Sequence, residues 1–126
     1  MRLLLIFLCF FTSLHGTLLQ TQFIFTQNSA KLVQYIFACG YKCTYGETYR
    51  SPAEALLNSR LGIGIARSYH CERLAIDLNL FLNDKPVYDE KHHEKFGIYW
   101  ESLNKKNRWG GRFKHLVDSG HFEMDL

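Results

Sequence analysis

Apolar residues recur every three or four positions between Thr26 and Cys39, a spacing that predicts an amphipathic helix. The residues with this spacing are Ala30, Leu32, Val33, Ile36 and Phe37. Thr26 is expected to cap the start of this helix, and Gly40 is expected to end it. The segment from Tyr41 to Tyr49 is rich in aromatic and β-branched residues, which predicts a short strand with Gly46 as a bulge.

The start of a second helix is marked by three residues with different roles at a helix N-terminus. Ser51 supplies a capping hydroxyl, Pro52 suits the first helical position, and Glu54 stands three residues after the cap. This helix is expected to continue to about Arg60. The glycines at positions 62 and 64 predict a loop, because a dinucleotide-binding motif would need a third glycine at the start of a helix.

The second half of the chain predicts further strands and one more helix. The apolar run from Leu74 to Leu82 predicts a strand, and Asn83 to Pro86 predicts a turn. A third main helix shows one apolar face, made by Phe96, Tyr99, Trp100 and Leu103. An irregular connection is expected at Arg108–Gly111 and a last strand at Phe113–Val117. Without repeats or low-complexity segments, this order predicts an α+β fold with a small, mainly antiparallel sheet and flanking helices.

Length and charge exclude several classes of protein. A chain of 126 residues that is 47% hydrophobic has room for one globular domain with one core. The formal net charge is only +3, and the loose basic cluster between positions 105 and 114 is typical of a solvated face. Aromatic and basic residues do not recur at the spacing of a nucleic-acid module, so no nucleic-acid partner is expected, and we expect a monomer.

The first sixteen residues have a different composition. Arg2 precedes the apolar run Leu3–Phe11, which is typical of a secretory signal and too short to span a bilayer comfortably. We therefore expect a leader at residues 1–16 and one globular domain at residues 17–126; a buried first helix or an extended start are the alternatives. With a signal the protein would be periplasmic or extracellular, and without one it would stay cytoplasmic until lysis.

The cysteines leave the redox compartment open. Cys39, Cys43 and Cys71 would remain after removal of a leader, and an odd number does not suit a closed disulfide framework. Cys39 and Cys43 would bridge in an exported protein, whereas buried free thiols are the alternative in a reducing cell.

The stretch SYHCERLAIDLNLF places His70 and Asp77 seven positions apart around an apolar run. If both bind one metal with bonds of about 2 Å, the chain must fold back between them, since seven residues span roughly 10 Å in a helix and over 20 Å in a strand. The polar residues 71–73 would supply that turn. A strand from Leu74 would then place Ala75 and Asp77 on one face, with apolar residues on the other.

His121 is the best candidate for a third ligand, and Asp118 stands three residues before it. Two imidazoles and one carboxylate leave a fourth position for water, which is the arrangement of catalytic zinc. Zinc lowers the pKa of its water toward about 7 and polarises a carbonyl. Asp118 would take the proton from this water and pass it to the leaving amine.

These residues resemble a known family of zinc peptidases. Ser68, His70, Ala75 and Asp77 match the pattern S-x-H-(x)4-A-x-D, and the pair at 118 and 121 matches the later D/E-x-x-H. The chain resembles D-alanyl-D-alanine carboxypeptidases and phage L-alanyl-D-glutamate endopeptidases, which have the Hedgehog/DD-peptidase-like fold. The resemblance covers nearly all of Leu18–Glu123, including GETYRSPAEA, the phage-like GIGIARSYHCERLAIDLNLF, and RWGGRF.

The resemblance implies roles for individual residues. It makes His70, Asp77 and His121 the Zn²⁺ ligands, Asp118 the catalytic acid/base, and Arg50 a catalytic and substrate-binding residue that steadies the carbonyl or the oxyanion. Ser68 would support the first ligand or touch the substrate.

Two positions depart from the family pattern. Arg73 stands where many members have glycine, and arginine at this position resembles the phage subgroup; Ala55 replaces a common glutamine.

The function implied by the resemblance is hydrolysis in the peptidoglycan stem peptide. An endolysin-like L-Ala-D-Glu endopeptidase is favoured over a D-Ala-D-Ala carboxypeptidase by the phage-like segments. The alternative is a catalytically inactive, zinc-stabilised binding module of the same fold. Three further residues remain: Glu123 either holds a ligand imidazole or faces water, and the tryptophans at 100 and 109 are expected to pack in the core.

Overall fold

The computed structural model describes residues 2–126, with side chains from residue 17 onward. The helices are α1 (Arg2–Ala38), α2 (Pro52–Arg60) and α3 (Glu90–Leu103), with short 3-10 helices η1 (Tyr69–Glu72) and η2 (Gly110–Arg112). The strands are β1 (Lys42–Tyr45), β2 (Ala75–Leu82), β3 (Lys85–Val87), β4 (Asn107–Trp109) and β5 (His121–Met124).

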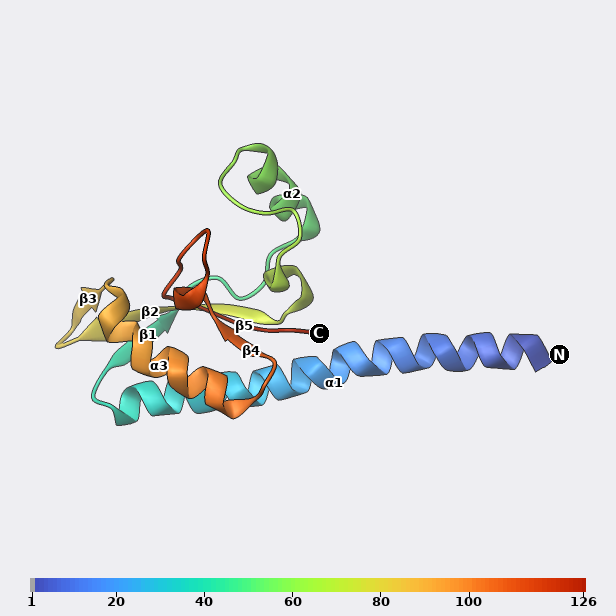
Figure 1. Ribbon diagram of the computed structural model, residues 1–126, viewed down its shortest axis with the longest axis horizontal. Coiled ribbons are helices and arrows are strands. Elements are labelled where there is room, and N and C mark those ends of the chain that lie inside the picture. Colours follow the sequence, from blue (N-terminus) through green and yellow to red (C-terminus); the bar gives the residue numbers. More distant parts are fainter. Residues whose placement is uncertain (1) are drawn as a thin grey trace.

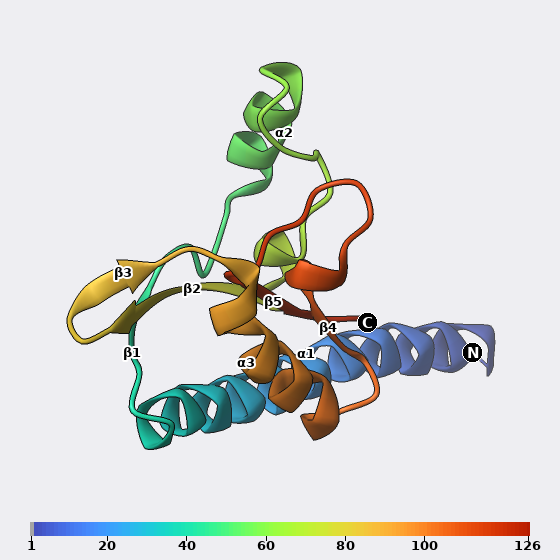
Figure 2. The same ribbon diagram turned by 60° about the vertical axis from the view of Figure 1, so that its left-hand side comes forward.

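The strands form one antiparallel sheet in the order β1-β2-β5-β4, with β3 also paired to β2. Helices α1 and α3 lie side by side against one face of this sheet (Figure 1). A second view shows α2 standing away from the sheet on the opposite side (Figure 2). The predicted α+β class with a small antiparallel sheet and flanking helices is therefore confirmed.

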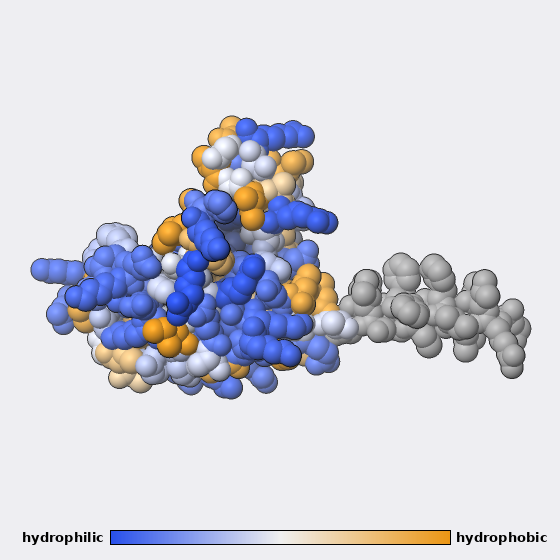
Figure 3. Space-filling view, in the orientation of Figure 1, coloured by the Kyte–Doolittle hydropathy of each residue, from blue (hydrophilic) through white to orange (hydrophobic). Residues whose placement is uncertain are grey.

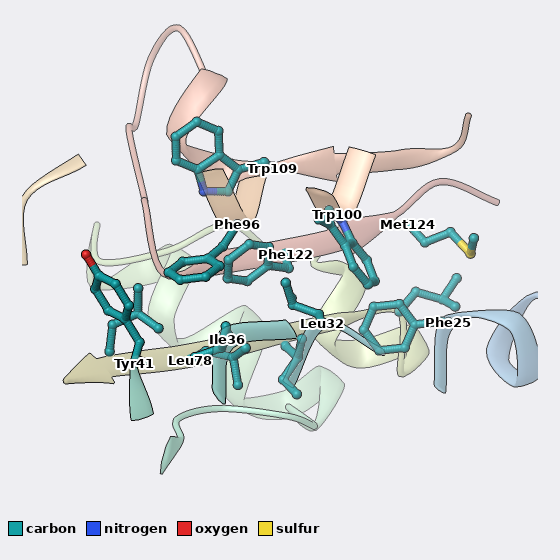
Figure 4. Close-up of a cluster of buried hydrophobic side chains, with 13 residues drawn as sticks. Phe25, Leu32, Ile36, Tyr41, Leu78, Phe96, Trp100, Trp109, Phe122 and Met124 are labelled. Carbon is teal, nitrogen blue, oxygen red and sulfur yellow. The ribbon is translucent and has the colours of Figure 1, made fainter. Parts of the chain in front are cut away.

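The core lies between the sheet and the two packed helices (Figure 4). It contains Phe25, Leu32 and Ile36 of α1, Phe96 and Trp100 of α3, Leu78 of β2, Trp109 of β4, and Phe122 and Met124 of β5. Both tryptophans are buried packing residues, as expected from the sequence. Removing such an aromatic side chain from a core typically costs about 3–5 kcal/mol.

The first helix differs from its prediction. It begins far before Thr26, whose hydroxyl bonds the carbonyl of Gln22 inside the helix and so caps nothing. Its buried face includes Phe25, Leu32 and Ile36, whereas Phe37 is half exposed. Gly40 does end the helix, with a φ of 80° that suits glycine. The side chains of residues 1–16 lie outside the described part, so the leader boundary remains a prediction.

The second helix and the β2 hairpin follow their local signals. Ser51 accepts a hydrogen bond from the Glu54 amide, and Pro52 takes the first turn. The turn after β2 has Asn83 and Asp84 at φ angles of 52° and 60°, which is the backbone of a two-residue hairpin. This hairpin adds β3, a strand that the apolar pattern did not predict.

The last strand is misplaced in the sequence prediction. Residues 113–117 form a loop, and the final strand is β5 at His121–Met124. Phe122 and Met124 enter the core while His121 and Glu123 point to the other face, so HFEM has the period-two alternation of a strand. The expected irregular connection at Arg108–Gly111 contains the end of β4 and the start of η2.

The state of the cysteines and the hydropathy of the helices can also be described. Cys39, Cys43 and Cys71 are free thiols in this structure. No helix within the described part of the chain combines the length and hydropathy needed to cross a bilayer.

We expect Gly97→Ala to destabilise the fold by about 1–3 kcal/mol, because an added methyl group overpacks a dense interior. A Cβ at this position of α3 would lie 2.1 Å from Cδ2 of the buried Trp109 ring. Urea unfolding would measure the loss. Ile98→Ala, which shortens a 52% exposed neighbour, is the control, and equal midpoints for the two variants would contradict this packing.

Candidate metal centre

His70 is positioned by a tight fold-back of the chain before β2. The Ser68 hydroxyl accepts from the His70 amide at 3.3 Å and thereby caps η1. Arg73 then adopts a left-handed φ of 56° and turns the chain into β2. The fold-back expected between His70 and Asp77 is therefore present. A left-handed φ is one that glycine adopts more readily than other residues, and here arginine adopts it.

Asp77 faces away from the core on β2. Its neighbours Ile76 and Leu78 are buried in the core, as the alternation predicts. The antiparallel register places Asp77 opposite His121 and Ala75 opposite Glu123. A β-bulge lies on the other edge of β2: Gly46 donates to the Asp77 carbonyl at 2.8 Å, and the Asp77 amide donates to the Glu47 carbonyl at 2.9 Å.

Three side chains from distant parts of the chain converge at this point. His70, Asp77 and His121 present ligand atoms that all lie within 4.8 Å of one another. Asp77 Oδ1 is 3.4 Å from His70 Nε2 and 3.0 Å from His121 Nδ1. Donors with bonds of about 2 Å to a tetrahedral zinc are separated by about 3.3 Å, so the residues fit this ion.

Glu123 contacts the imidazole of His121 on the side away from the other two ligands. Its Oε2 lies 2.7 Å from His121 Nε2, on the side of the ring opposite Asp77. The small Ala75 stands opposite Glu123 and leaves room for this carboxylate. Arg108 bonds Glu123 in turn, and its Nε is 3.2 Å from Asp125. This arrangement fixes the ring so that Nδ1 faces the other ligands, as carboxylate partners of metal-bound histidines do.

Charge and burial shift the pKa values of these groups strongly when no metal is bound. Burial raises the pKa of Asp77, but hydrogen bonds from His121 and His70 outweigh it and lower the pKa to about 2. Burial likewise raises the pKa of Glu123, yet its bonds to His121 and Arg108 lower it overall. The site therefore holds two carboxylates in their charged form around His121.

Arg50 is held near the same centre by Glu47. The Arg50 Nε donates to Glu47 Oε1 at 2.7 Å, and Nη2 donates to the second oxygen. The Arg50 amide also donates to the carbonyl of His70 at 3.3 Å. Sequence reasoning missed Glu47, although its place three residues before an arginine was a usable signal. Its hydrogen bond to Arg50 lowers the pKa of Glu47 and raises that of Arg50.

Asp118 sits on an exposed loop that leads into β5. Its amide donates to the Gly110 carbonyl at 3.0 Å, and its carbonyl accepts from the His121 amide at 3.1 Å. A Cβ on Gly110 would meet the Asp118 carbonyl at 2.3 Å, so only glycine permits this approach. The Trp109 indole donates to the Ser119 carbonyl at 2.9 Å and further fixes the loop. Asp118 lines a cavity of about 680 Å³, as do Leu78 and Gly120, which adjoin Asp77 and His121 in the sequence.

Residues 63–124 match the family model described as D-alanyl-D-alanine carboxypeptidase. The match confirms the resemblance to this peptidase family. It contains the converging ligands and Asp118, whereas Arg50 lies before it.

A similar fold occurs in a solved structure, the L-Ala D-Glu endopeptidase ChiX of Serratia marcescens. The identity is 21%, the TM-score is 0.58, and the similarity covers 67% of each chain. No curated protein sequence matches this chain.

We expect the metal-free protein to lose stability as the pH rises from about 6.5 to 9. Burial lowers the pKa of His121, but its bonds to Asp77 and Glu123 prevail and raise it to about 9. Because the pKa of His121 is higher in the folded state, its protonated ring stabilises the fold fully below pH 6.5, the pKa in the unfolded chain. This stabilisation is lost as the pH rises through the folded pKa of about 9. The loss is on the order of 3 kcal/mol.

Thermal unfolding in a chelator between pH 6 and 10 measures this effect. His121→Gln is the control, because it cannot titrate and keeps the other ionisable groups. A pH dependence identical in the two proteins would contradict the role of His121.

Proposed function

We propose that this protein is a zinc-dependent peptidase that hydrolyses a peptide bond in the stem peptide of peptidoglycan. The observation that supports it best is the convergence of His70, Asp77 and His121 on one point, with Glu123 behind the last ring. The family match and the shared fold agree with this site. The donor set has two imidazoles and one carboxylate, which leaves one position of a tetrahedral ion open.

Each polar residue around the ligands has a distinct role in this proposal. A bound zinc ion would supply Lewis-acid polarisation of the scissile carbonyl and a water of lowered pKa. Asp118 lines the cavity and stands three residues before His121, and in this proposal its carboxylate takes a proton and returns it to the leaving amine. Arg50 offers Nη1 to the carbonyl oxygen, because Glu47 occupies its other two nitrogen atoms.

Cleavage between L-Ala and D-Glu is our favoured reaction. The Serratia structure with the shared fold is named for this bond, and the phage-like sequence segments favour it. The family model is described by the other candidate reaction, removal of terminal D-Ala. Access to the wall follows from export by the proposed leader at residues 1–16, with residues 17–126 as the peptidase domain, or from release on lysis.

Mass spectrometry of muropeptides after digestion tests the reaction directly. We expect zinc-loaded protein to release fragments with a new amino-terminal D-Glu, because hydrolysis of L-Ala-D-Glu exposes that amine. Loss of one terminal D-Ala would instead assign carboxypeptidase activity. An unchanged muropeptide profile, with zinc bound and the fold intact, would contradict the proposed function and favour the binding-module alternative.

Two substitutions separate metal binding from proton transfer. Asp118→Ala should retain stoichiometric zinc and lose at least about 10²-fold in cleavage rate, because general acid–base catalysis supplies that much. His70→Ala should lose both zinc and activity. Zinc content by mass spectrometry and initial rates on purified peptidoglycan check both expectations.

Asp84→Ala is the matched control, since Asp84 is an exposed acid whose only ion pair within the described part of the chain is with Lys42. Cleavage at the unmodified rate by Asp118→Ala would remove the role assigned to that carboxylate. Unaltered zinc binding by His70→Ala would remove His70 from the ligand set.

A further inference from the structure

The cavity that Asp118 lines lies at a gap in the sheet. β5 pairs with Ala75–Asp77 and β3 pairs with Leu80–Leu82, both on the edge of β2 opposite β1. Between them, this edge is open at residues 78–79 except for one bond, from the Leu78 amide to the Gly120 carbonyl at 2.9 Å. The cavity of about 680 Å³ is lined by both sides of this gap and by the start of α3.

Two residues that line the cavity are sequence neighbours of proposed metal ligands. Leu78 directly follows the ligand Asp77, Gly120 directly precedes the ligand His121, and both line the cavity. Asp118 lines it as well. A peptide whose scissile bond lies at the ligands therefore has this cavity within reach for an adjoining part of its chain.

His93 is a buried side chain that the proposed chemistry does not use. It lies in the first turns of α3, is only 4% exposed, and lines the cavity. Its Nδ1 is 2.8 Å from the Asp89 carbonyl oxygen, which can only accept, so Nδ1 carries a proton. Within the described residues, Nε2 has no hydrogen-bond partner. A neutral ring with this tautomer presents Nε2 as an acceptor.

The charges that line the cavity are all acidic. Glu90 and Asp118 contribute carboxylates, and neither forms an ion pair with another described residue. No lysine or arginine belongs to the lining. Two carboxylates and an acceptor nitrogen favour a positively charged donor and disfavour a carboxylate in the same space.

We propose that this cavity is a subsite for a primary ammonium group of the substrate, bound by His93 Nε2 and by the carboxylate of Glu90, while Asp118 keeps its role in proton transfer. The inference rests on the proposed peptidase function and specifies which substrates the site prefers. The ammonium group is either the free amino terminus of a stem peptide or the side-chain amine of a diamino acid within it. Both sources present the same chemistry, so the experiment must separate them.

The test uses the full chain loaded with zinc and the peptide L-alanyl-γ-D-glutamyl-L-lysine. Four forms are compared: unmodified, acetylated on the α-amine, acetylated on the ε-amine, and acetylated on both. Nuclear magnetic resonance titration gives a dissociation constant for each form, and the peptide signals in the same tube report hydrolysis. We expect acetylation of the recognised amine to weaken binding at least tenfold.

Glu90→Gln and His93→Leu should each reduce this preference to about twofold or less, because they remove a charge or the acceptor. The matched controls are Glu94→Gln, one turn further along α3, and His115→Gln, on the exposed loop; both should keep the full preference. Glu90 is exposed, so its variant tests the idea even where His93→Leu fails to fold.

Equal binding of all four forms, or no binding of any form, would overturn the subsite. An unchanged preference in folded Glu90→Gln and His93→Leu would overturn it as well. These results are distinguishable from failure of the peptidase assignment, which would show as intact peptides in every tube whatever the binding constants.

Discussion

The pairing of β2 with β5 is the constraint on which the rest of this site depends. It sets Asp77 opposite His121, two residues 44 positions apart in the chain. Because side chains alternate along a strand, a slip of one residue would turn a ligand into the core. The register is held by the apolar residues on the opposite face, where Ile76 and Phe122 are buried. The packing of the core therefore determines the geometry of the site.

Polar contacts then hold the converging side chains in place. Both ring nitrogens of His121 are hydrogen-bonded, one to Asp77 and the other to Glu123. Arg108 forms an ion pair with Glu123. Buried charges are tolerated only where such partners exist. His70 differs, because its buried Nδ1 has no hydrogen-bond partner among the residues that the structure describes. The imidazole from η1 thus contacts one carboxylate, whereas the imidazole from β5 contacts two.

The molecule separates its apolar and polar surfaces in space. Helices α1 and α3 cover one face of the sheet, and the ligands, Arg50 and the loop of Asp118 lie away from that core. The body is largely hydrophilic on the face shown in Figure 3, while apolar residues gather on the projecting knob around α2. These exposed residues are Leu56, Leu57, Leu61, Ile63 and Ile65. Glycine at 97 and 110 permits the close backbone packing that seats Trp109 and the Asp118 loop.

The sequence alone determined what depends on neighbouring residues. The cap at Ser51, the helix end at Gly40, the fold-back after His70 and the alternation along β2 were all predicted, because each rests on local backbone preferences or on a two-residue period. The motifs around His70 and His121 also named the residues that converge. The prediction that Thr26 starts the first helix was wrong. Tertiary packing extends α1 through this residue, although threonine is locally an acceptable cap.

Tertiary structure decided what depends on partners distant in the chain. The strand expected at residues 113–117 is a loop, since β5 is fixed by pairing with β2 and β4, and its period-two pattern is only four residues long. Register and packing also determine three other features. These are the hydrogen bond between Glu123 and His121, the hydrogen bonds between Glu47 and Arg50, and the gap between β3 and β5. A linear pattern contains no information on which strand edges remain open, because that depends on where both neighbouring strands end.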